Sequence, residues 1–523
     1  MIDENFKHTR EYVNTKFKHL SDIEREKIFQ LFRQKGIFPY DYVTSYNIMN
    51  ETHLPCKDKF YSKLKQEGIS YKEYYRAKLV WRLTGCKTFG DYCDNYMEID
   101  VYLLADCLEN YRNIIYDKNE IDAFHSYSAP GLSWQIGLKQ CGEAFEKEHP
   151  GEEFSLELLT DYDMLLMIES GIRGGFSGTL GKRYAKANNK YLHDYDPKIP
   201  SSYLQYLDAN NLYGDGMKQK LPYSDFKWMT TNEYMDLFER KNNGDPEAID
   251  YFKTHGRIYK VDLTYTDECK LKTWKFPLAP EKKSILPEDL NEWQKKFLST
   301  DADGKPKASK IKKLIVDLKD KKEYVVHERN LMFYTDMGMK VTKVHSIISF
   351  REEAWLEPYI DYNTKLRTES KTDFEKNIWK LMNNAFYGKT CENIRNRVDV
   401  KFVSSKDQAT KLQTNPFYKR GTIFIEDKLI AIQLGIKKVK FDKPIYTGFA
   451  ILELSKLHMY KSFYEVILVK WPDAIIIGFD TDSFFLYIPT DDLYKDLLDM
   501  KDIFDTSDYP NIPTLEANVK RKI

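Results

Sequence analysis

The pattern of apolar and polar residues between positions 474 and 488 predicts a strand, a tight turn and a second strand. Apolar runs at 474–479 and 484–488 flank the polar residues Asp480-Thr-Asp-Ser. An extended backbone would point the side chains of Asp480 and Asp482 to the same side. Two carboxylates at a hairpin tip suit Mg²⁺, which prefers oxygen ligands. The same residues are ordinary turn formers, so this pattern alone leaves a purely structural turn open.

A second apolar strand is predicted at Tyr203–Leu207, and it ends at Asp208. The following residues, Ala-Asn-Asn-Leu-Tyr-Gly214, suit a turn and the start of a helix. An acid at a strand end can bind a metal ion, and backbone amides at a helix start can bind phosphate. An aspartate that only caps the helix is the structural alternative.

A helix is predicted from about Lys371 to Asn393. Lys376, Lys380, Asn384 and Tyr387 are spaced 4, 4 and 3 residues apart, which places them on one helix face. The positions expected to pack inward are Ile378, Leu381, Met382 and Ala385. Two lysines, an amide and a phenol on one face suit a triphosphate and a stacked base. An amphipathic helix with a solvated basic face fits the same spacing.

The remaining pattern predicts an α+β chain whose domains are not contiguous in sequence. Residues 20–115 are mostly helical in pattern, most clearly over Glu98–Arg112. Polar stretches with Gly, Pro or Asn predict connections at Asn188–Ser202, Lys241–Asp250 and Thr300–Lys313. No repeat with a period of 20–50 residues is present, which excludes solenoids and propellers.

Composition narrows the class of protein. The 523 residues include 80 Lys plus Arg and 80 Asp plus Glu, so a partner that needs a basic surface must be bound by a local patch. Hydrophobic residues make up 42% and aromatic residues 15%, enough for sizeable cores. The apolar runs are shorter than a membrane span of about 20 residues. The charged N-terminus lacks an apolar leader, and the seven scattered cysteines lack a C-x-x-C pair. These features predict an intracellular protein, nuclear or cytoplasmic, that does not bind a membrane.

Together and in order, the three segments resemble the polymerase motifs of family B DNA polymerases. Asp208–Gly214 (DANNLYG) resembles D-x-x-S-L-Y-P, Lys380–Gly388 (KLMNNAFYG) resembles K-x-x-x-N-S-x-Y-G, and Asp480–Ser483 is D-T-D-S. Asn211, Gly214 and Ala385 depart from the usual residues but leave the carboxylates, the lysine and the tyrosines in place.

Further matches resemble the protein-primed subgroup. Ile172-Arg-Gly-Gly-Phe176 is similar to its Y-x-G-G motif through Arg173, Gly174 and Gly175, although Ile172 replaces the tyrosine. Lys456 resembles the basic residue of a primer-template-binding helix. The long stretch between Asp208 and Lys380 is similar to the insertion of these polymerases. The amino-acid sequence as a whole resembles polymerases of Polinton/Maverick-type transposons and related linear elements.

The two ends are similar to incomplete parts of such a polymerase. Tyr96-Met-Glu-Ile-Asp100 resembles the third 3′–5′ exonuclease motif, but the earlier acidic motifs are absent, so an exonuclease is not expected. The chain stops at Lys520-Arg-Lys-Ile523, about where a thumb would begin. The resemblance implies a piece of a longer right-hand polymerase: a palm of antiparallel sheet and helices, helical fingers, and the C-terminal part of an RNase H-like domain. The implied domains are an exonuclease remnant (1–150), first palm part (151–260), insertion (261–370), fingers (371–445) and second palm part (446–523).

The resemblance also implies roles for single residues in adding deoxynucleotides to a primer 3′ end. Asp208 and Asp482, with Asp480 nearby, would hold two Mg²⁺ ions, and Lys380 would neutralise phosphate charge. The residues implied to contact the incoming nucleotide are Leu212, Tyr213, Lys376, Asn384, Tyr387 and Gly388, with amides from Ala209 to Leu212 on the phosphates. Arg173, Gly174, Gly175 and Lys456 would contact DNA. The implied partners are primer-template DNA, deoxynucleoside triphosphates and a terminal protein. An inactive mobile-element remnant that at most binds nucleic acid is the alternative.

Overall fold

The computed structural model describes residues 5–505 except 182–183, 301–302, 305–306, 308–310 and 427. It divides into two compact units, residues 1–132 and 133–523, each with its own core. The predicted boundary at residue 150 stays a prediction, and the terminal Lys520–Ile523 lies outside the described residues. Within the described part, no helix is both long and apolar enough to span a bilayer.

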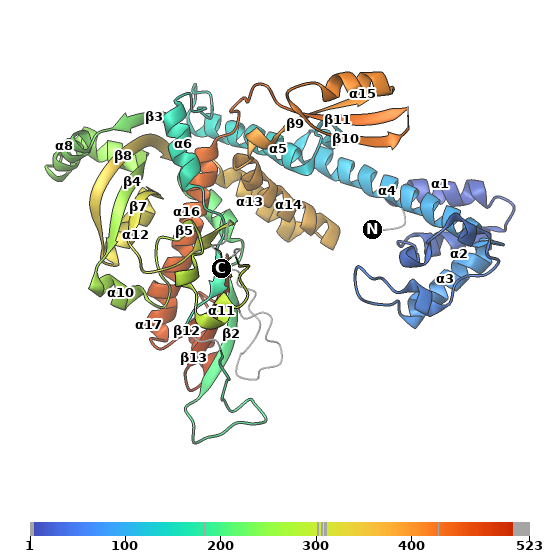
Figure 1. The fold of residues 1–523 in the computed structure, drawn as a ribbon, viewed down its shortest axis with the longest axis horizontal. Coiled ribbons are helices and arrows are strands. Elements are labelled where there is room, and N and C mark those ends of the chain that lie inside the picture. The colour runs from blue at the N-terminus through green and yellow to red at the C-terminus, as the bar shows by residue number, and fades with distance from the viewer. Residues whose placement is uncertain are drawn as a thin grey trace. The chain divides into compact units, whose positions relative to one another are not determined.

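The first unit is helical, as the sequence predicts for residues 20–115 (Figure 1). Its helices are α1 (Lys7–Lys16), α2 (Asp22–Phe32), α3 (Tyr71–Leu83) and α4 (Phe89–Asn119), with short 3₁₀ turns η2 (Tyr40–Tyr42), η3 (Tyr46–Asn50), η4 (Lys57–Phe60) and η5 (Ala123–His125). One core joins α1, α2 and α4 through residues such as Val13, Phe29 and Ile99. A second core joins η4, α3 and α4 through Phe60, Ala77 and Phe89. Among its described residues there is no sheet, so its origin as an exonuclease remnant stays a prediction.

The described residues of the second unit form four antiparallel sheets and the helices around them. The sheet that carries the predicted motifs has the order β1-β12-β13-β2. Its strands are β1 (Ser177–Thr179), β12 (Ile475–Asp480), β13 (Ser483–Pro489) and β2 (Ser202–Asp208). Strands from distant parts of the chain therefore pair directly, and Asp208 lies opposite Ser483. The strands predicted around 203–207 and 474–488 are confirmed.

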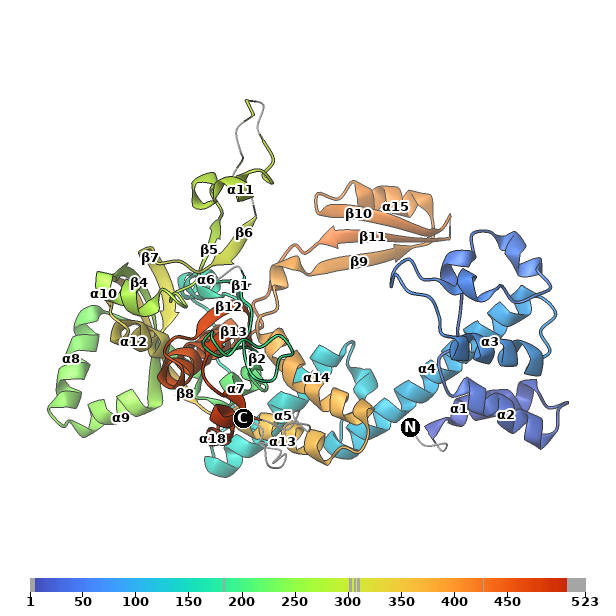
Figure 2. The ribbon, with the colours of Figure 1, turned by 90° about the horizontal axis from the view of Figure 1, so that it is seen from below.

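A second sheet, with the order β3-β8-β4-β7, lies to the left of this one in Figure 1. Its strands are β3 (Leu221–Met229), β8 (Met339–Glu353), β4 (His255–Tyr265) and β7 (Lys321–His327); the helices of this region are α8 (Thr231–Asn242), α9 (Pro246–Thr254), α10 (Asp267–Thr273) and α12 (Glu328–Asp336). The connection predicted at Lys241–Asp250 instead includes the start of α9, which Asp245 caps. Strands β5 (Glu281–Ser284) and β6 (Lys312–Ile315) pair separately, with η6 (Pro287–Asp289) and α11 (Glu292–Lys295) between them (Figure 2). Half of the predicted connection at Thr300–Lys313 lies outside the described residues.

Helix α16 (Ile445–Lys461) is the centre of the second unit. Fourteen of its residues are buried, and it contacts α7, α14, α6, α12 and β3. A helix that is apolar on all sides must be covered on all sides, as α16 is. The other helices that lie at least partly in this unit are α5 (Ala129–Glu148), α6 (Tyr162–Gly171), α7 (Leu212–Lys218), α13 (Glu357–Glu369), α14 (Asp373–Thr390), the π-helical turn η8 (Ser462–Ile467), α17 (Leu468–Lys470) and α18 (Leu493–Asp499).

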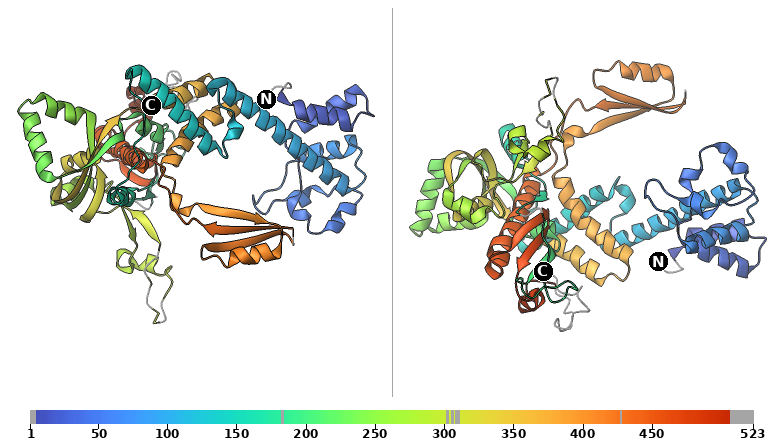
Figure 3. Two further views of the ribbon diagram at one scale, coloured as in Figure 1. Left: turned by 90° about the horizontal axis from the view of Figure 1, so that it is seen from above. Right: turned by 60° about the horizontal axis from the view of Figure 1, so that its bottom comes forward.

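The range 371–445, expected to form helical fingers, is helical only in its first part. After α14 and η7 (Ile394–Asn396), the chain forms a sheet with the order β10-β11-β9 and the helix α15 (Lys406–Gln413). The strands are β9 (Val398–Val403), β10 (Tyr418–Ile425) and β11 (Leu429–Gly435). Figure 3 shows α15 against one face of this sheet, where Ala409, Ile430 and Ile432 make a small core of their own.

Candidate active site

The turn between β12 and β13 carries two of the predicted carboxylates. Asp480 ends β12, Asp482 directly precedes β13, and the Asp482 amide donates to the Asp480 carbonyl at 2.6 Å. Thr481 between them has a φ of +53°, in the left-handed region that β-branched residues rarely adopt. The predicted hairpin is confirmed, but the extended backbone assumed between the two aspartates is wrong because the chain turns at Thr481.

Asp208 reaches the same place from β2. The Ala209 amide donates to the Asp482 carbonyl at 2.7 Å, which ties the end of β2 to the turn. Asn211 has a φ of +58° and precedes α7, so the predicted order of strand, turn and helix is confirmed. The predicted phosphate-binding role of the Ala209 amide is not supported, because the carbonyl of Asp482 already accepts its hydrogen bond.

The charges around Asp482 show that the predicted groups converge. Partial burial raises the pKa of Asp482 most, and the negative charges of Asp208 and Asp480 raise it further, whereas Lys380 lowers it. Two strand ends, a turn and a helix therefore place three acids and one lysine within electrostatic range of one another. This is an accumulation of negative charge, which a divalent cation would relieve.

The most compact group of three potential metal ligands lies elsewhere in the second unit. Among the described residues, the only three potential ligands whose atoms all lie within 4.8 Å of one another are Glu148, His149 and Glu353. Asp208, Asp480 and Asp482 do not form such a triple in this conformation. The His149 ring and the Glu353 carboxylate form a hydrogen bond of 2.9 Å, and Glu148 is exposed.

Helix α14 presents the predicted polar face. Lys376, Lys380, Asn384 and Gly388 are exposed and Tyr387 is half-buried. The inward residues are Ile378, Trp379, Met382, Asn383, Ala385 and Phe386. Leu381, expected to pack inward, is instead 46% exposed.

Two tyrosines join this helix to α7. The rings of Tyr213 and Tyr387 are stacked, with centroids 4.6 Å apart and planes 12° from parallel. The predicted nucleotide-contacting tyrosines thus meet. Leu212, predicted beside them, has a buried side chain that packs into the main core of the second unit. Because Leu212 also lines the cavity beside Asp208 and Asp482, its contact with a nucleotide stays a prediction.

The two predicted DNA-binding cations are buried. Arg173 donates to the carboxylate of Glu453 at 3.3 Å and to the Val325 carbonyl at 2.7 Å, and its guanidinium lies 3.8 Å from the ring centroid of Tyr324. Lys456 donates to the Arg173 carbonyl at 2.6 Å and lies 3.9 Å from Glu453. We correct the prediction: these side chains bond to protein groups, so direct DNA contact is not available to them here.

The loop that Arg173 anchors supports the turn of the aspartates. Gly174 and Gly175 are exposed, and the Thr481 amide donates to the Phe176 carbonyl at 3.0 Å. A Cβ atom at Gly175 would lie 2.3 Å from the Thr481 side-chain oxygen, whereas one at Gly174 would meet nothing within 4 Å. Glycine at 175 thus permits a close approach to the turn.

Sequence reasoning missed Glu453, the acid between the two buried cations. Its side chain is 1% exposed, and one carboxylate oxygen has no hydrogen-bond partner among the described residues. The signal in the sequence was a single acid in the apolar run Phe449–Leu454, followed three residues later by Lys456. An isolated charge in a core helix needs a buried partner.

A cavity of about 600 Å³ opens beside Asp208 and Asp482. It is lined by residues of β2, α7, β13 and the end of α16, and by 503–505. His458 and Asp215, which sequence reasoning also missed, meet across it at 3.1 Å, and this hydrogen bond lowers the pKa of Asp215. The cavity gives the predicted carboxylates access to a ligand.

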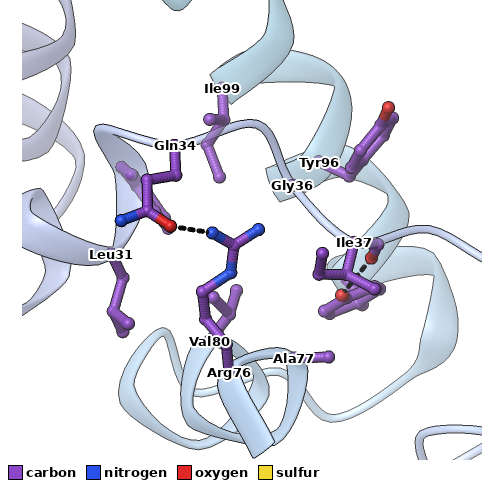
Figure 4. A pocket seen from close by; sticks show the side chains of 11 residues that line it. Leu31, Gln34, Gly36, Ile37, Arg76, Ala77, Val80, Tyr96 and Ile99 are labelled. Carbon is purple, nitrogen blue, oxygen red and sulfur yellow. Dashed lines mark hydrogen bonds between the residues drawn. The ribbon is translucent and has the colours of Figure 1, made fainter. Parts of the chain in front are cut away.

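The predicted exonuclease motif lies in the first unit. Tyr96 on α4 is buried, stacks on Phe38 with centroids 4.7 Å apart, and hydrogen-bonds to Tyr40. It lines a cavity of about 20 Å³, room for about one water molecule, into which Arg76 points (Figure 4). No carboxylate lines this cavity, and Asp100 is half-buried one helix turn beyond Tyr96. The loss of exonuclease chemistry stays a prediction.

Solved structures of phi29 DNA polymerase are similar to this chain. Phi29 DNA polymerase complexed with primer-template DNA is 14% identical, with a TM-score of 0.43; the match covers 90% of this chain and 62% of that one. Its ternary complex with incoming nucleotides is 12% identical, with a TM-score of 0.42, and the match covers 88% and 61%. The chain spans about 60% of the length of the solved structures that it matches. None of the curated proteins matches it.

A family comparison covers most of the chain. Residues 20–466 match the family described as DNA polymerase type B, organellar and viral. The matched range includes the strand end at Asp208, the α14 face and the central helix α16. The chain therefore belongs to the organellar and viral type B DNA polymerases.

Proposed function

We propose that this chain catalyses template-directed addition of deoxynucleotides to a primer 3′ end, and that it serves protein-primed replication of a mobile element. The observation that carries the catalytic part is the convergence of Asp208, Asp480 and Asp482 with Lys380, beside a cavity open to ligands. Family membership supports the same chemistry. Protein priming rests on the resemblance of the Arg173-Gly-Gly segment, and of the long stretch between Asp208 and Lys380, to the protein-primed subgroup; its partner would be a terminal protein.

The donor set fits magnesium. Asp208 and Asp482, with Asp480 nearby, offer hard oxygen ligands in a place where their like charges already raise the pKa of one member. These residues would hold two Mg²⁺ ions, which when bound would activate the primer hydroxyl and neutralise triphosphate charge.

The other residues of the site act on the nucleotide and the template. Lys380, exposed on α14, would place its positive charge beside the departing pyrophosphate. Tyr213, fixed by its stack on Tyr387, would lie against the sugar and exclude a 2′-hydroxyl. Asn384 and Gly388 would line the nascent base pair, while Lys376, one helix turn from Lys380, would attract the triphosphate.

The test is primer extension by the full chain with Mg²⁺, beside two matched variants. Asp482→Asn removes one predicted metal-binding charge and should reduce extension by at least about a thousandfold. Asp473→Asn makes the same change at an exposed position just before β12 and should keep wild-type activity. Wild-type extension by Asp482→Asn would refute the assignment. No extension by the wild-type chain would favour the inactive remnant.

A further inference from the structure

The first unit carries a local charge excess that the whole chain lacks. Between positions 57 and 87 there are nine basic residues and three acidic ones, a formal charge of +6 in a chain whose total is zero. Five of the basic residues in this segment lie before α3 or at its start: Lys57, Lys59, Lys63, Lys65 and Lys72. A local patch of this kind attracts polyanions irrespective of the net charge.

Exposed aromatic rings lie within the same surface. Tyr71 is 82% exposed and Tyr75 is 62% exposed. Together with the exposed Lys78 and Arg82 they are spaced 4, 3 and 4 residues apart, which places all four on one face of α3. The two rings are therefore about 6 Å apart along the helix axis. We name these four residues the α3 stripe.

Neighbouring lysines already contact tyrosine rings of this region. The Lys57 amine lies 4.7 Å from the ring centroid of Tyr71, and the Lys78 amine lies 4.6 Å from that of Tyr74. Tyr74, unlike the stripe tyrosines, points inward, because its ring packs on Phe60 and its hydroxyl donates to the Pro55 carbonyl at 3.0 Å. The cations thus lie beside the rings of α3, while most of the Tyr71 and Tyr75 surface stays open.

We propose that the α3 stripe is a binding surface for single-stranded DNA. Open aromatic faces stack on unpaired bases, and flanking lysines and arginines bind the phosphates, a combination that tolerates any sequence. A duplex hides its base faces and would engage the cations alone. An acidic protein would use the charges but gains nothing from a row of open rings. The surface lies outside the residues proposed for catalysis, so it goes beyond the proposed function.

The test measures binding of the full chain to a labelled oligothymidine by fluorescence anisotropy. The double variant Tyr71→Ala/Tyr75→Ala should weaken binding at least fivefold. Lys78→Glu/Arg82→Glu should weaken it and should also flatten its salt dependence. The matched controls are Tyr46→Ala, at an 87% exposed tyrosine of η3, and Lys27→Glu, at an exposed lysine of α2. Both should bind like the wild type.

Two further experiments distinguish binding at the α3 stripe from binding at the palm, and binding of single-stranded DNA from binding of a duplex. Photo-crosslinking with an oligonucleotide that contains 5-iododeoxyuridine should label Tyr71 or Tyr75, and this readout does not depend on polymerase activity. Against a duplex of equal length, the tyrosine variant should behave like the wild type. Crosslinks confined to residues 133–523, unchanged anisotropy of the tyrosine variant, or an equal loss for duplex and single strand would each overturn the proposal.

Discussion

Lys456 is a buried amine whose protonation is linked to folding. Burial is the main reason that the pKa of Lys456 falls from 10.5 to about 8, although Glu453 opposes the shift. Between these two values the unfolded chain binds the proton more readily than the folded chain. The folded state therefore gains relative stability as pH rises through this interval and loses it as pH falls through 8.

The Lys456→Met variant makes this linkage measurable. Between pH 7 and 10, the free energy of unfolding of the wild type should rise by roughly 1–3 kcal/mol relative to the variant. Lys461→Met, at an exposed position of the same helix, should show no such trend relative to the wild type. Denaturant titrations at several pH values measure both differences. Parallel pH curves for the wild type and Lys456→Met would contradict the shift.

The stack of Tyr213 on Tyr387 leads to a prediction about sugar selection. Tyr213→Val removes the ring that the proposed function places against the sugar, so ribonucleotide incorporation relative to deoxynucleotide incorporation should rise roughly tenfold or more. Tyr213→Phe keeps the ring and should keep the discrimination. Single-nucleotide extension with each substrate compares the two variants. Unchanged discrimination in Tyr213→Val would place the selecting group elsewhere.

At the scale of elements, the Arg-Gly-Gly loop and the β12–β13 turn together hold the aspartates in position. Gly175→Ala would press a methyl group against Thr481, and Gly174→Ala adds the same group to open space. Because a displacement of about 1 Å at reacting groups can cost a hundredfold in rate, Gly175→Ala should reduce primer extension tenfold to a hundredfold. Gly174→Ala should stay near the wild-type rate.

A compensating change separates crowding from misfolding. Thr481→Gly removes the three atoms nearest to the new methyl group and suits the left-handed φ of +53° at that position. The double variant Gly175→Ala/Thr481→Gly should therefore recover part of the activity lost by Gly175→Ala. Equal rates for Gly174→Ala and Gly175→Ala would show that the contact has no effect on the site.

Local sequence patterns predicted the elements whose packing is determined by residues within the element itself. The β12–β13 strands, the end of β2 at Asp208 and the polar face of α14 all follow from apolar runs and helical spacing. The burial of Arg173 does not, because its partner Glu453 lies 280 residues away. The conformation at Thr481 is likewise set by the Phe176 carbonyl, a contact that no short window of sequence contains.

The β9–β11 sheet is another part of the fold that the sequence analysis did not predict. The alternation Ile430, Ile432, Leu434 is the strand signal in this region, and all three residues pack on one side with Ala409. The neighbouring β10 is exposed along its whole length, so its burial pattern carries no alternation. The expectation of helical fingers, which the family resemblance implied, therefore missed this separate small core.

At the scale of the whole molecule, the first unit has what an independent domain needs. Its two cores are built from residues 6–103, and the buried carboxylate of Asp106 accepts three hydrogen bonds from His8 and Thr9 at the start of α1. These contacts close the unit on itself, because α4 returns to the helix at the N-terminus.

A fragment of residues 1–128, which ends before α5, should therefore fold alone. We expect a helical circular dichroism spectrum, one cooperative thermal transition, and the affinity for oligothymidine that we infer for the α3 stripe. A shorter fragment, 1–98, lacks Ile99 and Asp106, so it loses part of the α1–α2–α4 core and the acceptor at the start of α1. It should not unfold cooperatively, since a small domain cannot lose core contacts of this size. A disordered 1–128 fragment would mean that the first unit needs the rest of the chain to fold.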